Sequence, residues 1–335
     1  MSSDKLFTSN YKEYFHGKRV LISGGTGLIG REVTDLIRKF GAEVYVVSLD
    51  SIKPFNDVTY IYGDLTDLNF CLEVIKDIDF VFHLAGIKGS IDVTKSRPAS
   101  FFVPLLMFNT NVLEASRRNG VKKLVYTSSI GAYPAAEIFE ETMGESGDPM
   151  DMYPGWAKRM AELQIRAYAE EYGLDWSVVR PCNVYGPGDN FDPNNAMVIP
   201  SLMMRISNGE DPLKVWGDGS AVRDFAFSRD VAMGTIQALI HGTRGSFVNL
   251  GSGVGYSIKE LVETLNQVVP FNYEFDASKS GGFPRRVMNI DRAREWVGYE
   301  PQTSLLEGLR ETWEWFQANK DEYLLKKNYF SSSEV

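Results

Sequence analysis

The sequence contains few of the residues that build metal centres and disulfide frameworks. Its 335 residues include two cysteines, Cys71 and Cys182, and three histidines, His16, His83 and His241. Two cysteines far apart in sequence form neither a disulfide framework nor a metal-ligand cluster, and three scattered histidines leave little scope for a histidine-rich site. We therefore expect no metal centre.

Long apolar runs and an excess of positive charge are also missing. No apolar stretch reaches the roughly 18 residues that a membrane span requires, and the first residues lack the pattern of a secretory signal. The 35 Lys and Arg residues against 44 Asp and Glu residues give a formal net charge of −9, which disfavours non-specific attraction to nucleic acid or anionic membranes. We expect a cytoplasmic enzyme without membrane or nucleic-acid partners, in which a few local basic groups hold any anionic ligand.

The sequence does contain a glycine-rich turn with the spacing Gly24-x-x-Gly27-x-x-Gly30. An apolar run at residues 19–23, typical of a buried strand, precedes it, and an amphipathic helix pattern follows over residues 31–39. Such a turn lets the backbone approach a pyrophosphate, and the helix N-terminus supplies N–H donors. The spacing alone is a weak signal, but in this context it predicts a dinucleotide site. The predicted contacts in the turn are Gly24, Gly27, Leu28 and Ile29.

Strand and helix patterns alternate through the first part of the chain. The predicted strands are residues 19–23, 43–48, 58–62, 80–84, 123–128 and 176–180, and the predicted helices include 109–119, 156–172, 258–269 and 304–320. Alternation of this kind indicates βαβ units on a parallel sheet. From about Gly186 the sequence becomes rich in turns.

This layout predicts an α/β fold, a Rossmann-type doubly wound parallel sheet with a smaller, interleaved C-terminal substrate domain. The predicted parts are an N-terminal arm (1–17), an NAD-binding Rossmann domain (18–185), a mainly substrate-binding domain (186–328) and a disordered tail (329–335).

The end of the second predicted strand indicates the choice of cofactor. Asp50 lies 20 residues after Gly30, where an acid binds the ribose diol of NAD, although Ser48 occupies the position where the acid is usual. No arginine close downstream could receive a 2′-phosphate. We predict NAD, with NADP as the less favoured cofactor.

Two later strand ends are also expected near the cofactor. Gly63-Asp64-Leu65 follows the third strand, where a carboxylate can accept a hydrogen bond from the adenine amino group. His83-Leu84-Ala85-Gly86 ends the fourth strand, where small residues let the backbone pass beside the cofactor. His83 lies in an apolar strand and is more typical of a packed structural histidine than of a catalyst.

These motifs and three further ones occur in a fixed order along the chain. The further motifs are Thr127-Ser128-Ser129, residues 180–187 (RPCNVYGP) and residues 217–225 (GDGSAVRDF). In this the chain resembles the extended branch of the short-chain dehydrogenase/reductase family, specifically its nucleotide-sugar epimerases, reductases and dehydratases, from about residue 18 to 318. Residues 85–88 (AGIK) resemble the UDP-galactose 4-epimerase pattern, in which the lysine contacts cofactor and substrate phosphates.

The resemblance implies sets of binding residues for the cofactor and for a nucleotide-diphosphate sugar. The further cofactor contacts are Ser48, Asp50, Asp64, Leu65, Leu84, Ala85, Gly86, Lys88, Thr127, Lys158 and Pro181. The substrate contacts are Lys88, Ser129, Asn183, Asn195, Val198, Trp216, Arg223, Arg285 and Arg286, with one of the last two on the diphosphate and Trp216 either stacked on the base or simply packed. Arginines suit this task because their planar guanidinium groups bind phosphate oxygens bidentately.

The chain departs from the family at the catalytic tyrosine. The family carries Tyr-x-x-x-Lys at the start of a helix, and the lysine, bonded to the nicotinamide ribose, lowers the pKa of the tyrosine for acid/base work. Here Pro154 lies four residues before Lys158, and Tyr153 lies one residue early. The interval from Ser129 to Pro154 matches the family, so an insertion is not an attractive explanation. Pro154 suits the first helical position, which would leave Tyr153 at or before the cap.

The catalytic residues predicted from this comparison are Ser129, Tyr153 and Lys158. If Tyr153 does not transfer the proton, the alternatives are Ser129 with a water chain, or an acid such as Glu137 or Glu141. A second departure is that Leu105, Phe108 and Asn109 replace a polar Asn-x-x-Gly-Thr run, which predicts an unusually apolar helix start near the nicotinamide.

The lack of certain catalytic groups disfavours two kinds of reaction. Residues 130–132 (IGA) lack the acid pair that dehydratases place after the catalytic serine, and no cysteine near Ser129 serves a 3,5-epimerisation. Hydride chemistry at one carbon remains, most simply at C4 of the hexose. The lysine at residue 88 favours a 4-epimerase, with a C4 reductase or dehydrogenase as the first alternative and a non-catalytic NAD sensor or scaffold as the second. Helices 109–119 and 156–172 occupy the segments through which relatives dimerise, which predicts a homodimer through a four-helix bundle.

Overall fold

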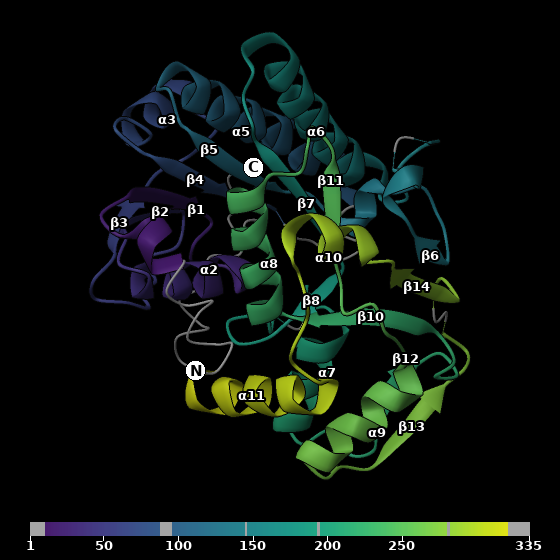
Figure 1. Ribbon diagram of the computed structural model, residues 1–335. Coiled ribbons are helices and arrows are strands. Elements are labelled where there is room, and N and C mark those ends of the chain that lie inside the picture. Colours follow the sequence, from purple (N-terminus) through teal and green to yellow (C-terminus); the bar gives the residue numbers. More distant parts are fainter. Residues whose placement is uncertain (1–10, 88–95, 145, 193–194, 280–281, 321–335) are drawn as a thin grey trace.

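A computed structural model describes residues 11–87, 96–144, 146–192, 195–279 and 282–320. A seven-stranded sheet, parallel at every pairing, has the order β11-β7-β5-β4-β1-β2-β3 (Figure 1). Its strands are β1 (Arg19–Ser23), β2 (Glu43–Ser48), β3 (Thr59–Tyr62), β4 (Phe80–His83), β5 (Lys123–Thr127), β7 (Ser177–Pro181) and β11 (Phe247–Leu250). The order reverses between β1 and β4, and in such sheets ligands bind at that point, outside the carboxyl ends of the strands.

Helices cover both faces of this sheet (Figure 1). One layer is formed by α3 (Leu68–Val74), α5 (Pro98–Arg118) and α6 (Met152–Tyr172), which pack on one another. The opposite layer is formed by α2 (Leu28–Lys39), α8 (Ser228–His241) and α10 (Asp291–Val297). The predicted α/β, doubly wound parallel fold is therefore confirmed.

A second, smaller unit lies beyond the carboxyl ends of the large sheet (Figure 1). Its main sheet has the order β12-β10-β14-β6, β8 pairs with β10, and β9 pairs with β13. These strands are β6 (Ile138–Phe139), β8 (Asn183–Tyr185), β9 (Leu213–Trp216), β10 (Val222–Phe227), β12 (Gly255–Ser257), β13 (Tyr273–Asp276) and β14 (Arg285–Met288). The unit also holds α7 (Val198–Ser207), α9 (Ile258–Val268) and α11 (Leu305–Ala318), whereas the 3₁₀ turns η1 (Ile130–Ala132) and η2 (Glu141–Met143) follow β5 and β6.

The two units exchange segments. β11 follows β10 in sequence but completes the large sheet, while β6 precedes β7 but joins the small one. Each unit has its own apolar core, the smaller one including Phe191, Leu261 and Phe316.

The described end of the predicted N-terminal arm packs against the large unit. Residues 11–15 are helical, and the buried rings of Tyr11 and Phe15 contact Phe40 and Phe80. The predicted tail 329–335 lies outside the described residues. No helix in the described ranges is long and apolar enough to cross a membrane.

Candidate active site

The glycine-rich turn forms a close-packed cradle between β1 and α2. Gly24 has a φ of +71°, and a Cβ there would lie 2.9 Å from the Cα of Ala85. A Cβ on Gly30 would lie 2.1 Å from the carbonyl oxygen of Gly24. Gly27 is the N-cap of α2, no side chain caps the helix, and its first turn holds no acid. The turn therefore leaves backbone N–H groups available, and it fits the pyrophosphate of a dinucleotide.

A hydroxyl–carboxylate cluster lies at the end of β2. The Thr26 hydroxyl lies 2.8 Å from the Ser48 hydroxyl and donates to the Asp50 carboxylate at 3.0 Å. The Asp50 N–H in turn donates to Ser48 Oγ at 3.0 Å. Because Thr26 belongs to the glycine-rich turn, the Asp50 carboxylate is fixed beside the cradle, where it suits the hydroxyls of a ribose.

The segment after β3 is fixed by local hydrogen bonds. The Asp64 carboxylate is exposed and accepts a hydrogen bond from the Thr66 N–H at 2.8 Å. Leu65 is buried, and its carbonyl accepts from the Asn111 side chain at 3.1 Å. These contacts tie the predicted adenine segment to α5.

His83 lies at the centre of a buried hydrogen-bond chain. Its Nδ1 lies 2.7 Å from Ser23 Oγ and its Nε2 lies 2.9 Å from Asn109 Oδ1, while Asn109 donates to the Tyr126 hydroxyl at 3.1 Å. Burial and the nearby Lys158 lower the pKa of His83 to about 3. The imidazole is therefore neutral at physiological pH and holds the end of β4, where Leu84, Ala85 and Gly86 pass the cradle. Lys88 lies outside the described residues.

The second predicted departure is corrected by the course of α5. This helix begins at Pro98, so Leu105, Phe108 and Asn109 lie well inside it and not at its start. Leu105 and Phe108 are buried, and the ring of Phe108 lies edge-on to His83 at 5.9 Å between centroids. These residues support the His83 chain.

Lys158 lies between the ends of β4 and β5. Its ammonium donates to the Thr127 carbonyl at 2.6 Å and lies 4.9 Å from the centre of the Tyr126 ring. A Cβ on Gly86 would come within 3.9 Å of the same nitrogen. Burial lowers the pKa of the lysine to about 8. The structure thus brings together three of the predicted cofactor residues, Gly86, Thr127 and Lys158.

A buried ion pair holds the next turn of α6 against the sheet. Glu162 accepts a hydrogen bond from Ser128 Oγ and pairs with Arg180 at 2.6 Å. The Arg180 guanidinium lies between the rings of Tyr133 and Phe247, 4.3 and 3.7 Å from their centroids. Sequence reasoning missed this group, which fixes the face of α6 that carries Lys158.

The structure places Tyr153 on another face of α6. The helix begins at Met152, so Pro154 is its third residue and not its first as the sequence suggested. Residues five apart in a helix differ by about 140° around the axis, whereas residues four apart differ by about 40°. Tyr153 therefore does not share the face of Lys158. Its ring lies 6.0 Å from that of Phe102 on α5, and the residue is 43% exposed.

The other predicted proton-transfer groups lie around η1 and β6. Ser129 Oγ accepts from the Gly131 N–H at 3.1 Å and caps η1. Glu141 is buried, and its carboxylate accepts from the Asn249 N–H at 3.0 Å. Glu137 is exposed, and its backbone carbonyl accepts a hydrogen bond from the Val287 N–H at 3.0 Å, beside β6.

Two arginines lie side by side on one face of the small sheet. Arg223 of β10 is the register partner of Arg286 of β14, and paired residues of neighbouring strands project to the same face. Burial lowers the pKa of both guanidinium groups, and the charge of Arg286 lowers that of Arg223 further. The buried Nε of Arg286 has no hydrogen-bond partner among the described residues. Two desolvated like charges on one face are suited to an anionic ligand.

Arg285 points the other way. As the neighbour of Arg286 in the strand it projects to the opposite face, where its guanidinium lies 3.3 Å from the Cβ position of Gly255. Of the two predicted diphosphate arginines, the structure therefore favours Arg286.

The remaining predicted substrate residues lie on other elements of the small unit. Asn183 lies on β8 and donates to the carbonyl of Asp224 at 2.9 Å. Asn195 is buried in the turn before α7, which begins at Val198. Trp216 ends β9 and is 66% exposed. Pro181, a predicted cofactor residue, ends β7 two residues before Asn183.

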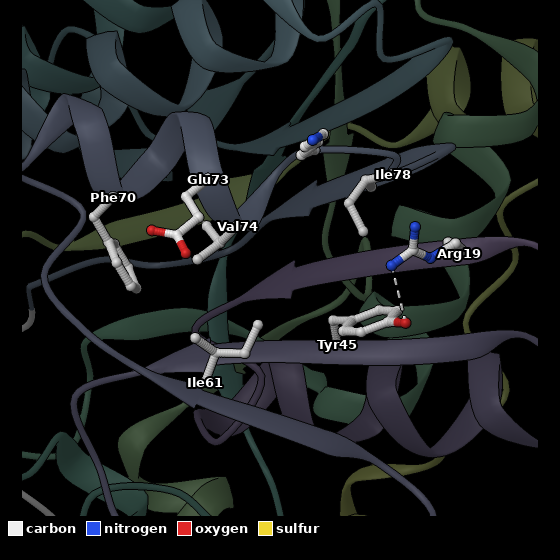
Figure 2. Close-up of a pocket in the computed structure, with 8 residues that line it drawn as sticks. Arg19, Tyr45, Ile61, Phe70, Glu73, Val74 and Ile78 are labelled. Atoms are coloured by element: carbon white, nitrogen blue, oxygen red, sulfur yellow. Dashed lines mark hydrogen bonds between the residues drawn. The ribbon is translucent and has the colours of Figure 1, made fainter.

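A cavity of ≈ 300 Å³ lies between α3 and the strands β1, β2 and β3 (Figure 2). It is lined by Arg19, Tyr45, Ile61, Phe70, Glu73, Val74, Lys76 and Ile78. Arg19 begins β1, whereas the cradle follows its end, so this cavity is separate from the candidate active site. Within the described ranges, no group of three or more His, Cys, Asp or Glu residues could hold a metal ion.

The chain is similar to known proteins over most of its length. Residues 20–251 match the model of the NAD dependent epimerase/dehydratase family. The GDP-L-fucose synthase of Escherichia coli (strain K12) is 29% identical, over 91% of this chain and 98% of that protein. A dTDP-4-dehydro-6-deoxy-D-allose reductase of a Streptomyces species is also 29% identical, over 91% and 98%. The UDP-glucose 4-epimerase of Thermotoga maritima, solved with UDP-glucose, has a TM-score of 0.81 at 29% identity, over 90% of this chain and 99% of that one.

Proposed function

The chain belongs to the NAD dependent epimerase/dehydratase family, and from this premise we propose that it is a nucleotide-sugar 4-epimerase that works with NAD. It is an NAD(P)-dependent enzyme that modifies a nucleotide sugar, as its relatives are. In the proposed reaction the C4 hydroxyl of the hexose is oxidised transiently, and the hydride returns to the other face of C4.

The Asp50 carboxylate carries this proposal. Thr26 and Ser48 hold it beside the pyrophosphate cradle, where a 2′-phosphate would meet a like charge. This arrangement favours NAD over NADP. A reductase must take up a newly reduced cofactor in every turnover, whereas an epimerase recovers its hydride and can work with one bound NAD.

The other binding roles belong to residues of this chain. The bound cofactor accepts and returns the hydride. Lys158 lies where it can hold the nicotinamide ribose, the face of Arg223 and Arg286 can hold the diphosphate, and Ser129 lies two residues after β5, where it can contact the sugar. The sugar would lie between these groups, across the carboxyl ends of the strands.

A nucleotide-sugar C4 reductase is the second candidate. It is favoured by the GDP-L-fucose synthases and dTDP-sugar reductases among the relatives. Incubation with UDP-, GDP- and dTDP-hexoses and their 4-keto forms, with each cofactor, separates the two. A 4-epimerase converts the hexoses without net change in nicotinamide absorbance, whereas a reductase consumes reduced cofactor only with a keto-sugar.

NAD is expected to bind at least about tenfold more tightly than NADP, because a like-charge contact with Asp50 opposes the 2′-phosphate. Calorimetric titration with both cofactors checks this. Asp50→Asn should reduce the difference in affinity between NAD and NADP. Asp64→Asn, at the exposed acid after β3, should leave that difference unchanged. Tighter binding of NADP to the unsubstituted protein would contradict the assignment.

We also propose a homodimer through α5 and α6, which pack side by side. Val103 and Met107, one turn apart on α5, and Leu163 on α6 are exposed apolar side chains. Burial of such side chains is typical of a helix-bundle interface.

Met107→Glu or Leu163→Glu should therefore shift the protein toward a monomer, as measured by light scattering after size-exclusion chromatography. Val254→Glu, at an exposed valine beside β12, is the matched control. A dimer that persists in both helix variants, or a monomeric unsubstituted protein, would rule this interface out.

A further inference from the structure

Asp151 is an N-cap residue that does not cap its helix. It immediately precedes α6, yet its side chain bonds to no N–H of the first turn. An N-cap aspartate normally accepts from the second or third helical N–H. The third helical residue here is Pro154, which has no N–H. The replacement at the family's tyrosine position thus removes one of the two donors that would hold this carboxylate.

The Asp151 carboxyl lies against the turn that follows Ser129. The Asp151 N–H donates to the Gly131 carbonyl at 3.2 Å, and a Cβ on Gly131 would lie 2.2 Å from Asp151 Oδ2. The lack of a side chain at Gly131 is therefore what makes room for the carboxyl. A Cβ on Gly155 would likewise lie 2.6 Å from the Gly131 carbonyl, so this turn and the start of α6 are in close contact. Ser129 Oγ accepts from the N–H of the same Gly131.

The surroundings of Asp151 suit a group that exchanges protons. Its side chain is exposed to solvent, and no described N–H or O–H donates to its carboxylate. Desolvation by the surrounding protein nevertheless raises the pKa of the carboxyl, against the opposing effect of Arg286. The carboxyl is thus packed against η1, near enough to Arg286 of the proposed diphosphate site to be affected by its charge.

We propose that Asp151 transfers the proton of the sugar's C4 hydroxyl, in place of the phenol that the family carries at position 154. The inference rests on the proposed function. In the oxidation the Asp151 carboxylate takes the proton of O4–H, the C4–H electron pair leaves as hydride to the oxidised nicotinamide, and C4=O forms. In the return the hydride adds to the opposite face of C4, and the protonated Asp151 gives its proton to O4.

Asp151→Asn is expected to lower kcat by about 10²–10⁴-fold, the usual effect of removing a positioned acid/base. KM for the nucleotide sugar should not rise, because the amide fills the same space and removes a negative charge near the diphosphate, and the affinity for NAD should stay nearly unchanged. Asp148→Asn, at an exposed acid in the same segment, is the matched control. Tyr153→Phe should retain kcat, since Tyr153 lies on another face of the helix.

Gly131→Ala tests the geometry without removing the acid. Its Cβ must displace the carboxyl from its position, so kcat should fall with normal NAD binding. A readout independent of turnover is the titration of the Asp151 carboxyl in a carbon-detected NMR difference between the unsubstituted protein and Asp151→Asn. It should titrate above the ordinary range of aspartate, which centres on about 3.9.

The outcomes separate the two proposals. Unchanged kcat in Asp151→Asn, or a large loss in Tyr153→Phe instead, overturns the role of Asp151 and leaves the proposed function standing. An unsubstituted protein that converts no nucleotide sugar overturns the proposed function and this inference with it.

Discussion

Lys158→Met should lower turnover by about 10²–10⁴-fold and weaken NAD binding at the same time. The ammonium is buried between the ends of β4 and β5, where its hydrogen bond to the Thr127 carbonyl fixes it beside the expected nicotinamide ribose. Methionine keeps the apolar stem and removes the charge and all three donors. Initial rates together with calorimetric NAD titration measure both effects, and Lys122→Met, at an exposed lysine, is the control.

The same lysine predicts a pH dependence. Burial lowers the pKa of Lys158 to about 8, so its positive charge is lost as pH rises through that value. NAD affinity of the unsubstituted protein should fall over this range, while that of Lys158→Met should be weak and flat. Normal turnover in Lys158→Met would show that the lysine does not serve the cofactor.

Arg223→Ala should weaken nucleotide-sugar binding by roughly 30- to 1000-fold, or about 2–4 kcal/mol, the effect of removing one partner of a charge-assisted phosphate contact. Its guanidinium shares a face with that of Arg286, and burial lowers the pKa of both. An anion that neutralises this pair gains from contacts with both.

Arg285→Ala is the matched control for Arg223→Ala. It removes the same charge from the same sheet, but on the opposite face, so affinity should stay close to that of the unsubstituted protein. Binding titrations with a UDP- or GDP-hexose measure both variants. Equal losses in the two variants would point to a general electrostatic effect, and no loss in Arg223→Ala would rule out its role on the diphosphate.

The large sheet could be predicted because its strands are short apolar runs in an alternating pattern. β1 and β2 have the predicted bounds, β3, β4 and β5 differ by one residue at one end, and β7 is shifted by one residue at both ends. The helix predicted at residues 109–119 is much longer, beginning at Pro98. Its first half contains Pro104, and proline is typical of a helix end. The same half is largely apolar and lacks the spacing of apolar and polar residues that indicates an amphipathic helix.

The candidate site shows where sequence reasoning ends. Motif spacing indicated Lys158, Asp50 and Arg223, because local order along the chain fixes their places. The choice between Arg285 and Arg286 depends on the register of β14 with β10, which no local pattern encodes. The hydrogen bond between His83 and Asn109 joins residues 26 positions apart, and it depends equally on tertiary packing.

The sequence at the first turn of α6 contains a further pattern that indicates a functional residue. Tyr153 is the catalytic residue that the sequence predicts, because it is adjacent to the family position. However, the helix starts two residues before Pro154, and the Tyr153 side chain lies toward α5. An aspartate placed three residues before a proline at a helix start is an N-cap deprived of a donor, and this pattern could have indicated Asp151.

The central claim, C4 epimerisation with recovery of the hydride, is tested most directly with a nucleotide-hexose that carries deuterium at C4. The NAD-loaded protein should convert it to the C4 epimer with the deuterium still at C4 and no lasting gain in reduced cofactor, as followed by NMR and absorbance. Loss of the label from C4, or product formed only when reduced cofactor is consumed in equal amount, would contradict the account.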